Sequence, residues 1–159
     1  MSRELIILRH AKSDWSGDEH DFDRPLAPRG RRQAPEAGQW LDARAGAIDL
    51  ALVSPARRTR STWELVAAEL DSPPPIRYDD RLYAAECRGL LDVVHELSDD
   101  LVRVVLVGHN PGVEDLVHLL TGVGVEMKTS TLAVIRLTDS WSAADDEAGT
   151  LLASGRPPG

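Results

Sequence analysis

The fold of this chain of 159 residues is decided by the stretch Leu5-Ile6-Ile7-Leu8-Arg9-His10-Ala11-Lys12-Ser13. Its apolar run stops directly at an arginine and a histidine. Such a run is typical of a buried strand that carries polar side chains to its C-terminal end. In open parallel α/β sheets, ligands bind at that end of the strands. Arg9 and His10 are therefore candidates for a binding site, although an isolated pair of this kind more often caps a strand or faces solvent.

Length and composition fit one domain of a cytoplasmic protein. A chain of 159 residues has the size of one folding unit, so residues 1–159 are expected to form a single domain. The formal net charge of −8 argues against general binding of nucleic acids or anionic membranes. The single cysteine, Cys87, excludes an internal disulfide and suits a reducing compartment. The charged N-terminus is too short for a signal peptide, and no run of about 18 apolar residues is present.

A sequence of strand, polar turn and helix occurs three times. The buried strands are expected at 4–9, 48–53 and 101–107. Four helices are expected. The first follows Pro28, the second runs from the polar stretch after residue 53 to about Leu70, and the last two begin near Cys87 and near Val113. This repetition predicts an α/β sandwich of three layers, with a mostly parallel sheet between two layers of helices.

The remaining segments modify this plan. A short strand is expected at 76–78, and strands at 131–137 and 149–154 predict an antiparallel edge, with a frayed tail at 155–159. Pro35 falls inside the first helix, whose apolar stripe includes Ala45. Because proline removes a helical hydrogen bond and Ala27 is a poor N-cap, we expect a kink or a late start there.

Two further features lie near the strand ends. The polar loop 12–23 is long for a compact domain, so we expect it to be functional or mobile, as a wall or a lid. Arginines cluster at 24–32 and at 57–60 in an otherwise acidic chain. Such clusters either cover solvated helix faces or build a local anion site.

The three strand ends predict a site without metal or cofactor. If they meet at one edge of the sheet, two histidines and at least two arginines converge there. The histidines show no His-x-x-x-His pair, and carboxylates are missing where a hydrolytic metal site needs them. Glycine-rich nucleotide loops and a nucleophile elbow are also absent from the sequence.

This combination of residues suits a phosphoryl group. Arginine binds phosphate oxygens through two parallel hydrogen bonds and stabilises the charge of a transferring phosphoryl group. A neutral imidazole can attack phosphorus, and neighbouring arginines favour the neutral form. A backbone carbonyl at a strand end can hold the proton on the other ring nitrogen.

Three motifs carry a resemblance to a known family. Leu8-Arg9-His10-Ala11-Lys12-Ser13, the segment from Ser54-Pro55-Ala56-Arg57-Arg58 to Thr62, and Val107-Gly108-His109-Asn110-Pro111 resemble the histidine phosphatase superfamily, which has the phosphoglycerate-mutase-like fold. The motifs span about residues 5 to 137. The short chain and Arg24-Pro25-Leu26 resemble the SixA-type branch of phosphohistidine phosphatases.

The resemblance implies roles for particular residues. His10 would be the nucleophile, and Arg9, Arg58 and His109 would bind the phosphoryl group. The alternative to Arg58 is Arg57. Arg24 and Asn110 are further candidates for substrate binding, and Arg24 could equally be a solvated loop cation. Glu86 lies in the region where larger relatives carry a general acid, and Ala11 departs from the commonest Arg-His-Gly triplet.

The expected activity is that of a metal-independent phosphatase with a phosphohistidine intermediate. By resemblance, the substrate would be a protein phosphohistidine in signal transduction, such as one in a histidine-containing phosphotransfer domain. A small phosphomonoester is the alternative substrate. A non-catalytic phosphate-binding module of the same fold is the alternative function.

Overall fold

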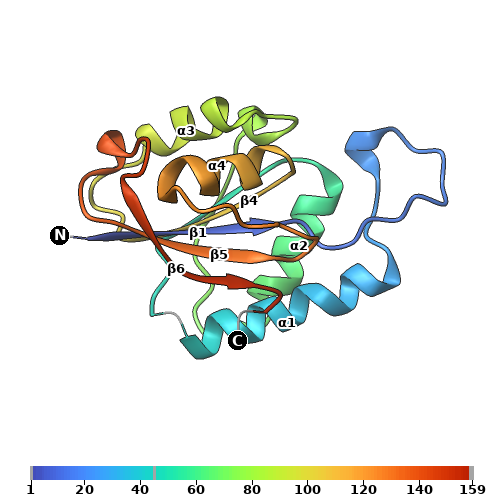
Figure 1. Ribbon diagram of the computed structural model, residues 1–159. Helices are drawn as coiled ribbons and strands as arrows, with labels where there is room; N and C mark the ends of the chain where they lie inside the picture. Colours follow the sequence, from blue (N-terminus) through green and yellow to red (C-terminus); the bar gives the residue numbers. More distant parts are fainter. Residues whose placement is uncertain (1, 45, 158–159) are drawn as a thin grey trace.

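A sheet of six strands runs through the computed structural model, which describes residues 2–44 and 46–157 (Figure 1). The strand order is β3-β2-β4-β1-β5-β6. The strands are β1 (Arg3–Arg9), β2 (Leu50–Val53), β3 (Ile76–Tyr78), β4 (Arg103–Gly108), β5 (Leu132–Leu137) and β6 (Gly149–Gly155). The first four are parallel, whereas β5 runs antiparallel to β1 and β6 antiparallel to β5. The predicted parallel sheet with an antiparallel edge is confirmed.

Helices cover both faces of this sheet, as predicted. They are α1 (Pro28–Arg44), α2 (Arg57–Ala67), α3 (Cys87–His95) and α4 (Gly112–Thr121). The first two pack on one face and the last two on the other (Figure 1). Along β1, Leu5 and Ile7 point into the core under α3 and α4, while Ile6 and Leu8 point into the core under α1 and α2. The apolar run of β1 is unbroken because both of its faces are buried.

The registers of the strands bring three C-terminal ends side by side. Arg9 of β1 pairs with Gly108 of β4, and Val53 of β2 pairs with Val107 of β4. The ladder continues one residue further, because the His10 N–H donates to the Gly108 carbonyl at 3.1 Å. The polar residues that follow β1, β2 and β4 therefore meet at one edge of the sheet.

Of the two alternatives expected for α1, a kink or a late start, the late start is wrong. The helix begins at Pro28 and continues through Pro35 to Arg44. Contacts with the preceding chain fix this start, since the Ala27 N–H donates to the Lys12 carbonyl at 2.9 Å and Gln33 accepts from the Lys12 N–H at 3.0 Å. Ala45, the last residue of the predicted apolar stripe, lies outside the described residues.

Several predicted boundaries shift by a few residues. Strand β2 begins at Leu50 instead of residue 48, β4 begins at Arg103 instead of residue 101, and α2 ends at Ala67 instead of Leu70. Within the tail predicted to fray, Gly155 pairs with Leu132, and Arg156 donates from Nε to the Thr129 carbonyl at 2.8 Å. Residues 158 and 159 lie outside the described residues. Among the described helices, none is long and apolar enough to cross a membrane.

Residues 14–25 form a loop between β1 and α1, which we call the arm. An antiparallel bridge between Ser13 and Leu26 closes its base, and the Asp14 N–H donates to the Pro25 carbonyl at 2.8 Å. A single turn of 3-10 helix, Asp21–Asp23, lies within it. The arm projects past the C-terminal end of β1 (Figure 1).

Candidate active site

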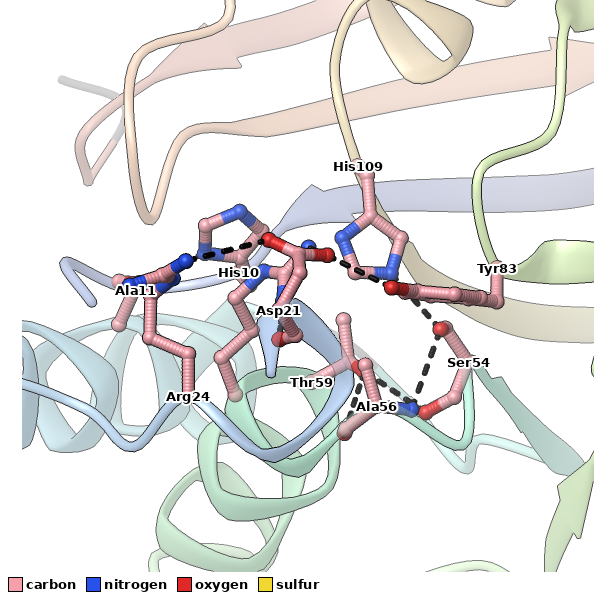
Figure 2. A network of polar contacts seen from close by, with 10 residues as sticks. His10, Ala11, Asp21, Arg24, Ser54, Ala56, Thr59, Tyr83 and His109 are labelled. Carbon is pink, nitrogen blue, oxygen red and sulfur yellow. Dashed lines mark hydrogen bonds and ion pairs between the residues drawn. The ribbon is translucent and has the colours of Figure 1, made fainter. Parts of the chain in front are cut away.

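His10 lies at the end of β1 with its ring buried and its proton fixed. Its Nδ1 is 2.8 Å from the Ala11 carbonyl oxygen, which can only accept, so Nδ1 carries the proton and Nε2 has the lone pair of the neutral ring (Figure 2). Burial, with Arg58 and Arg9 nearby, outweighs this hydrogen bond and lowers the pKa of His10 to about 4. The ring is therefore neutral at pH 7, as an attacking imidazole must be.

His109 faces His10 from the end of β4. The centroids of the two rings are 5.4 Å apart. Its Nε2 is 2.7 Å from the hydroxyl oxygen of Ser54, which follows β2. Burial, followed by the charge of Arg58, lowers the pKa of His109 to about 3. Its Nδ1 is buried and has no hydrogen-bond partner among the described residues, which leaves that nitrogen available to a bound group.

Arg58, in the first turn of α2, supplies a buried cation to the same space. Its Nη1 donates to the Asp21 carbonyl at 2.7 Å, and its Nη2 lies 3.1 Å from Asp21 Oδ2. Arg57 is exposed, and within the described part of the chain its side chain donates only to the carbonyl of Asp23, at 3.5 Å. Of the two arginines considered from the sequence, the structure brings Arg58 to the histidines.

Thr62 holds α2 against the end of β1. Its Oγ1 accepts from the Ala11 N–H at 3.0 Å and donates to the Arg58 carbonyl at 2.7 Å. One buried hydroxyl therefore joins the residue that follows His10 to the residue that carries the guanidinium. The spacing of this pair of contacts reflects one helical turn between Arg58 and Thr62.

Arg9 is held at the edge of the site by the segment that precedes β5. Its Nη1 donates to the Met127 carbonyl at 3.0 Å, and the carbonyls of Arg9 and His10 both accept from the Ser130 N–H. Burial lowers the pKa of Arg9, and Glu114 opposes this shift. Its Nε is buried without a partner among the described residues.

Asn110 supports the same segment. Its Nδ2 donates to the Met127 carbonyl at 2.7 Å, and Glu114 accepts from the Met127 N–H at 2.8 Å. The Met127 carbonyl therefore accepts hydrogen bonds from both Asn110 and Arg9. This contact gives Asn110 a role in placing the Met127 segment, and its predicted part in binding substrate stays a prediction.

The structure adds two functional candidates that the sequence did not indicate, Asp21 and Tyr83. The Tyr83 hydroxyl donates to Asp21 Oδ2 at 2.7 Å, and its ring meets the His109 ring edge to face with centroids 5.7 Å apart (Figure 2). This hydrogen bond, followed by the charges of Arg58 and Arg24, holds the pKa of Asp21 below its usual value. The length of the loop signalled function, but nothing in its pattern distinguishes Asp21 from four other acidic residues.

Arg24 and Glu86 differ in their surroundings. Arg24 is buried, with Nη2 3.7 Å from Asp21 Oδ1 and its guanidinium carbon 3.7 Å from the centroid of the Trp15 ring. It therefore belongs to the cationic side of the site. Glu86 is exposed at the residue before α3, and no hydrogen bond or ion pair among the described residues joins its side chain to His10 or His109. Its role as general acid stays a prediction.

The site thus combines two neutral imidazoles with three arginines. Such an arrangement suits a dianionic phosphoryl group, whose oxygens accept from guanidinium groups while a ring nitrogen approaches phosphorus. Within residues 2–44 and 46–157, no group of three or more His, Cys, Asp or Glu side chains is placed to hold a metal ion.

Proteins of other organisms are similar to this chain in sequence. An uncharacterized protein of Mycobacterium tuberculosis is 36% identical over 153 residues, which cover 89% of this chain and 93% of that protein. An uncharacterized chloroplastic protein of Arabidopsis thaliana is 30% identical over 91% of this chain and 71% of its own length.

Two solved structures, both provisionally assigned as the phosphohistidine phosphatase SixA, superpose closely. The protein from Nakamurella is 29% identical, with a TM-score of 0.89 over 99% of this chain and 97% of its own. The protein from Agrobacterium tumefaciens is 28% identical, with a TM-score of 0.83 over 98% of each chain. The sequence profile of the histidine phosphatase superfamily (branch 1) matches residues 5–88, which is more than half of the chain. With this fold and these relatives, the chain belongs to the histidine phosphatase superfamily, as a SixA-type member with a phosphoglycerate-mutase-like fold.

Proposed function

We propose that this protein is a phosphohistidine phosphatase in which His10 is the nucleophile. One observation carries the proposal: the His10 ring is buried and neutral, and Nδ1 is committed to the Ala11 carbonyl at 2.8 Å. The lone pair of Nε2 is then free for phosphorus. The provisional assignment of the two SixA structures as phosphohistidine phosphatases supports the same substrate class.

The reaction proceeds in two displacements. In the first, His10 Nε2 forms a bond to phosphorus while the bond from phosphorus to the nitrogen of the substrate imidazole breaks, and that nitrogen keeps the electron pair. In the second, the oxygen of water forms a bond to phosphorus while the bond from phosphorus to His10 Nε2 breaks. That nitrogen regains its lone pair, and both protons of the water leave with inorganic phosphate. Arg58, Arg9 and His109 hold the phosphoryl oxygens in both steps, so no metal ion takes part.

A phosphoramidate substrate reduces the need for a general acid. The leaving imidazole is basic and can be protonated before it departs, whereas the alkoxide of a phosphomonoester needs a proton donor. Glu86 is exposed and makes no described contact with either site histidine. The site is therefore better suited to a nitrogen leaving group than to an alcohol.

The proposed substrate is borne on a protein, such as a histidine-containing phosphotransfer domain of a cytoplasmic signalling system. The rim of the site carries two exposed aromatic rings on the arm, Trp15, which is 65% exposed, and Phe22, which is 36% exposed. Exposed aromatic side chains of this kind are favourable contacts for a protein surface.

The test is to trap the intermediate. Wild-type protein and His10→Ala are incubated, with and without chelator, with a phosphohistidine peptide and with an aryl phosphate. We expect wild-type protein to hydrolyse the peptide and to carry a base-stable, acid-labile phosphate on His10, and His10→Ala to do neither.

Other outcomes would decide against this proposal. Turnover of the aryl phosphate alone would identify a phosphomonoesterase. Binding of phosphate without turnover or phosphoenzyme would identify a binding module, and loss of activity in chelator would revive a metal requirement.

A further inference from the structure

The carboxylate of Asp21 lies among the donors that a phosphoryl group would use. One of its oxygens, Oδ2, accepts from Arg58 Nη2 at 3.1 Å and from the Tyr83 hydroxyl at 2.7 Å. The other, Oδ1, lies 3.7 Å from Arg24 Nη2. An oxyanion surrounded by two guanidinium groups and one hydroxyl is the environment that proteins build for phosphate.

We infer that Asp21 is an internal occupant of an anion cradle formed by Arg58, Tyr83 and Arg24, and that the substrate phosphoryl group displaces its carboxylate from this cradle. The inference rests on the proposed function, since it concerns how the phosphoryl group reaches His10. It adds Tyr83 to the residues that touch the substrate, because an oxygen that replaces Asp21 Oδ2 meets Arg58 and Tyr83. An oxygen that replaces Oδ1 lies near Arg24, which was already a candidate from the sequence.

The cradle adjoins the attacking histidine. The Tyr83 ring contacts the ring of His109 with centroids 5.7 Å apart, and the rings of His109 and His10 are 5.4 Å apart. In Figure 2 the Asp21 carboxylate lies between the rings of His10 and His109, and a dashed line joins it to the Tyr83 hydroxyl. The charge of Asp21 acts on both imidazoles, so a phosphoryl group in the cradle lies beside the two rings.

The arm can release Asp21 without disturbing the core. The Asp21 side chain is 48% exposed, and none of the three residues of its 3-10 turn is buried. The base of the arm is held separately by the bridge between Ser13 and Leu26. The backbone carbonyl of Asp21 also accepts from Arg58 Nη1, at 2.7 Å. A change of the side chain alone thus keeps a contact that positions Arg58.

The decisive variant is Asp21→Asn, which removes the negative charge and keeps the size of the side chain. Binding of inorganic phosphate is measured by calorimetry on wild-type protein, Asp21→Asn and Asp21→Ala. An internal competitor raises the apparent Kd, which equals the intrinsic Kd divided by the fraction of molecules whose cradle is free. If Asp21 leaves about one third of the cradles free, both variants should bind phosphate about threefold more tightly or better. Thermal unfolding of each variant confirms that it is folded.

Asp23→Asn is the matched control. Asp23 belongs to the same 3-10 turn, and its substitution by asparagine changes the net charge by the same amount. Among the described residues, its carboxylate makes no hydrogen bond or ion pair with Arg58 or Tyr83. We expect its Kd for phosphate to stay within about twofold of the wild-type value. An equal gain in Asp23→Asn would show a general charge effect and overturn the inference.

Tyr83→Phe tests the cradle itself. In the Asp21→Asn background it removes one donor without restoring the competitor, so we expect phosphate to bind about fivefold more weakly than to Asp21→Asn alone. Unchanged or weaker binding in Asp21→Asn relative to wild-type protein would overturn the inference. That failure is distinguishable from failure of the proposed function, which would appear as a wild-type protein without phosphate on His10.

Discussion

Ala11 stands where the commonest triplet of the superfamily has glycine, and the structure explains why alanine fits. Its methyl group is fully buried in the core that contains Leu8 and Leu26. Among the described residues other than glycine, Ala11 is not one of those with positive φ, so this position does not need the conformational freedom of glycine. The departure from the family pattern therefore concerns packing.

We accordingly expect Ala11→Gly to destabilise the fold. Loss of a buried methyl group and the greater freedom of glycine in the unfolded chain should lower the free energy of unfolding by about 1–2 kcal/mol. Denaturant titration of the two proteins measures this difference. A variant as stable as the wild type would show that the methyl group contributes nothing.

Ser54 is the residue that fixes the orientation of His109. Its hydroxyl oxygen is 2.7 Å from His109 Nε2, and both groups are buried. In Ser54→Ala the ring loses this partner, and we expect the rate of phosphoryl transfer to fall about tenfold, which corresponds to about 1.4 kcal/mol.

The nitrogen shifts of His109 in NMR spectra should change in Ser54→Ala, because the tautomer depends on this hydrogen bond. Ser72→Ala, at an exposed serine, is the control and should leave rate and spectra unchanged. Wild-type rate and spectra in Ser54→Ala would contradict the assignment of Ser54 to the orientation of the ring.

At the scale of secondary-structure elements, β1 and α2 are coupled through Thr62. We expect Thr62→Val to lower the free energy of unfolding by about 1–3 kcal/mol, because it leaves the buried N–H of Ala11 without an acceptor. Thr62→Ser keeps the hydroxyl and should restore most of the lost stability. If Val and Ser substitutions behave alike, the hydrogen bonds to Ala11 and Arg58 are not the cause.

The order of the elements could be predicted from the sequence, but the contacts of the arm could not. Strands buried on both faces give unbroken apolar runs, and the pairing of parallel strands then brings His10, Arg58 and His109 together. The arm has no such periodicity. Its contact between Asp21 and Tyr83 joins residues separated by 62 positions, through side chains that no pattern marks. The start of α1 was missed for a similar reason, since distant contacts of Lys12 fix it.

At the scale of the whole molecule, the two site histidines make stability depend on pH. Burial lowers the pKa of His10 to about 4 and that of His109 to about 3, whereas an unfolded histidine has a pKa of about 6.5. Below pH 6.5 the unfolded chain therefore binds protons that the native protein does not, and the native state loses stability as pH falls.

Between pH 7 and pH 5 we expect a loss of about 1–2 kcal/mol for each of the two histidines. Denaturant titrations at pH 7, 6 and 5 measure it. Carboxylates whose pKa is lowered, such as Asp21, contribute only at more acidic pH. His10→Asn should reduce the slope over this range, and an unchanged slope would contradict the assignment.

The central position of β1 has a consequence for how the molecule opens. Strand β1 is paired on both sides, with β4 and with β5, so its amides should exchange with solvent only in global unfolding events. The exposed arm should exchange through local opening at much lower free energy. The groups that hold His10 therefore belong to the last part of the fold to open, and the arm, which carries Asp21 and Arg24, belongs to the first. Hydrogen exchange should therefore detect opening of the arm at denaturant concentrations well below those at which the amides of β1 exchange.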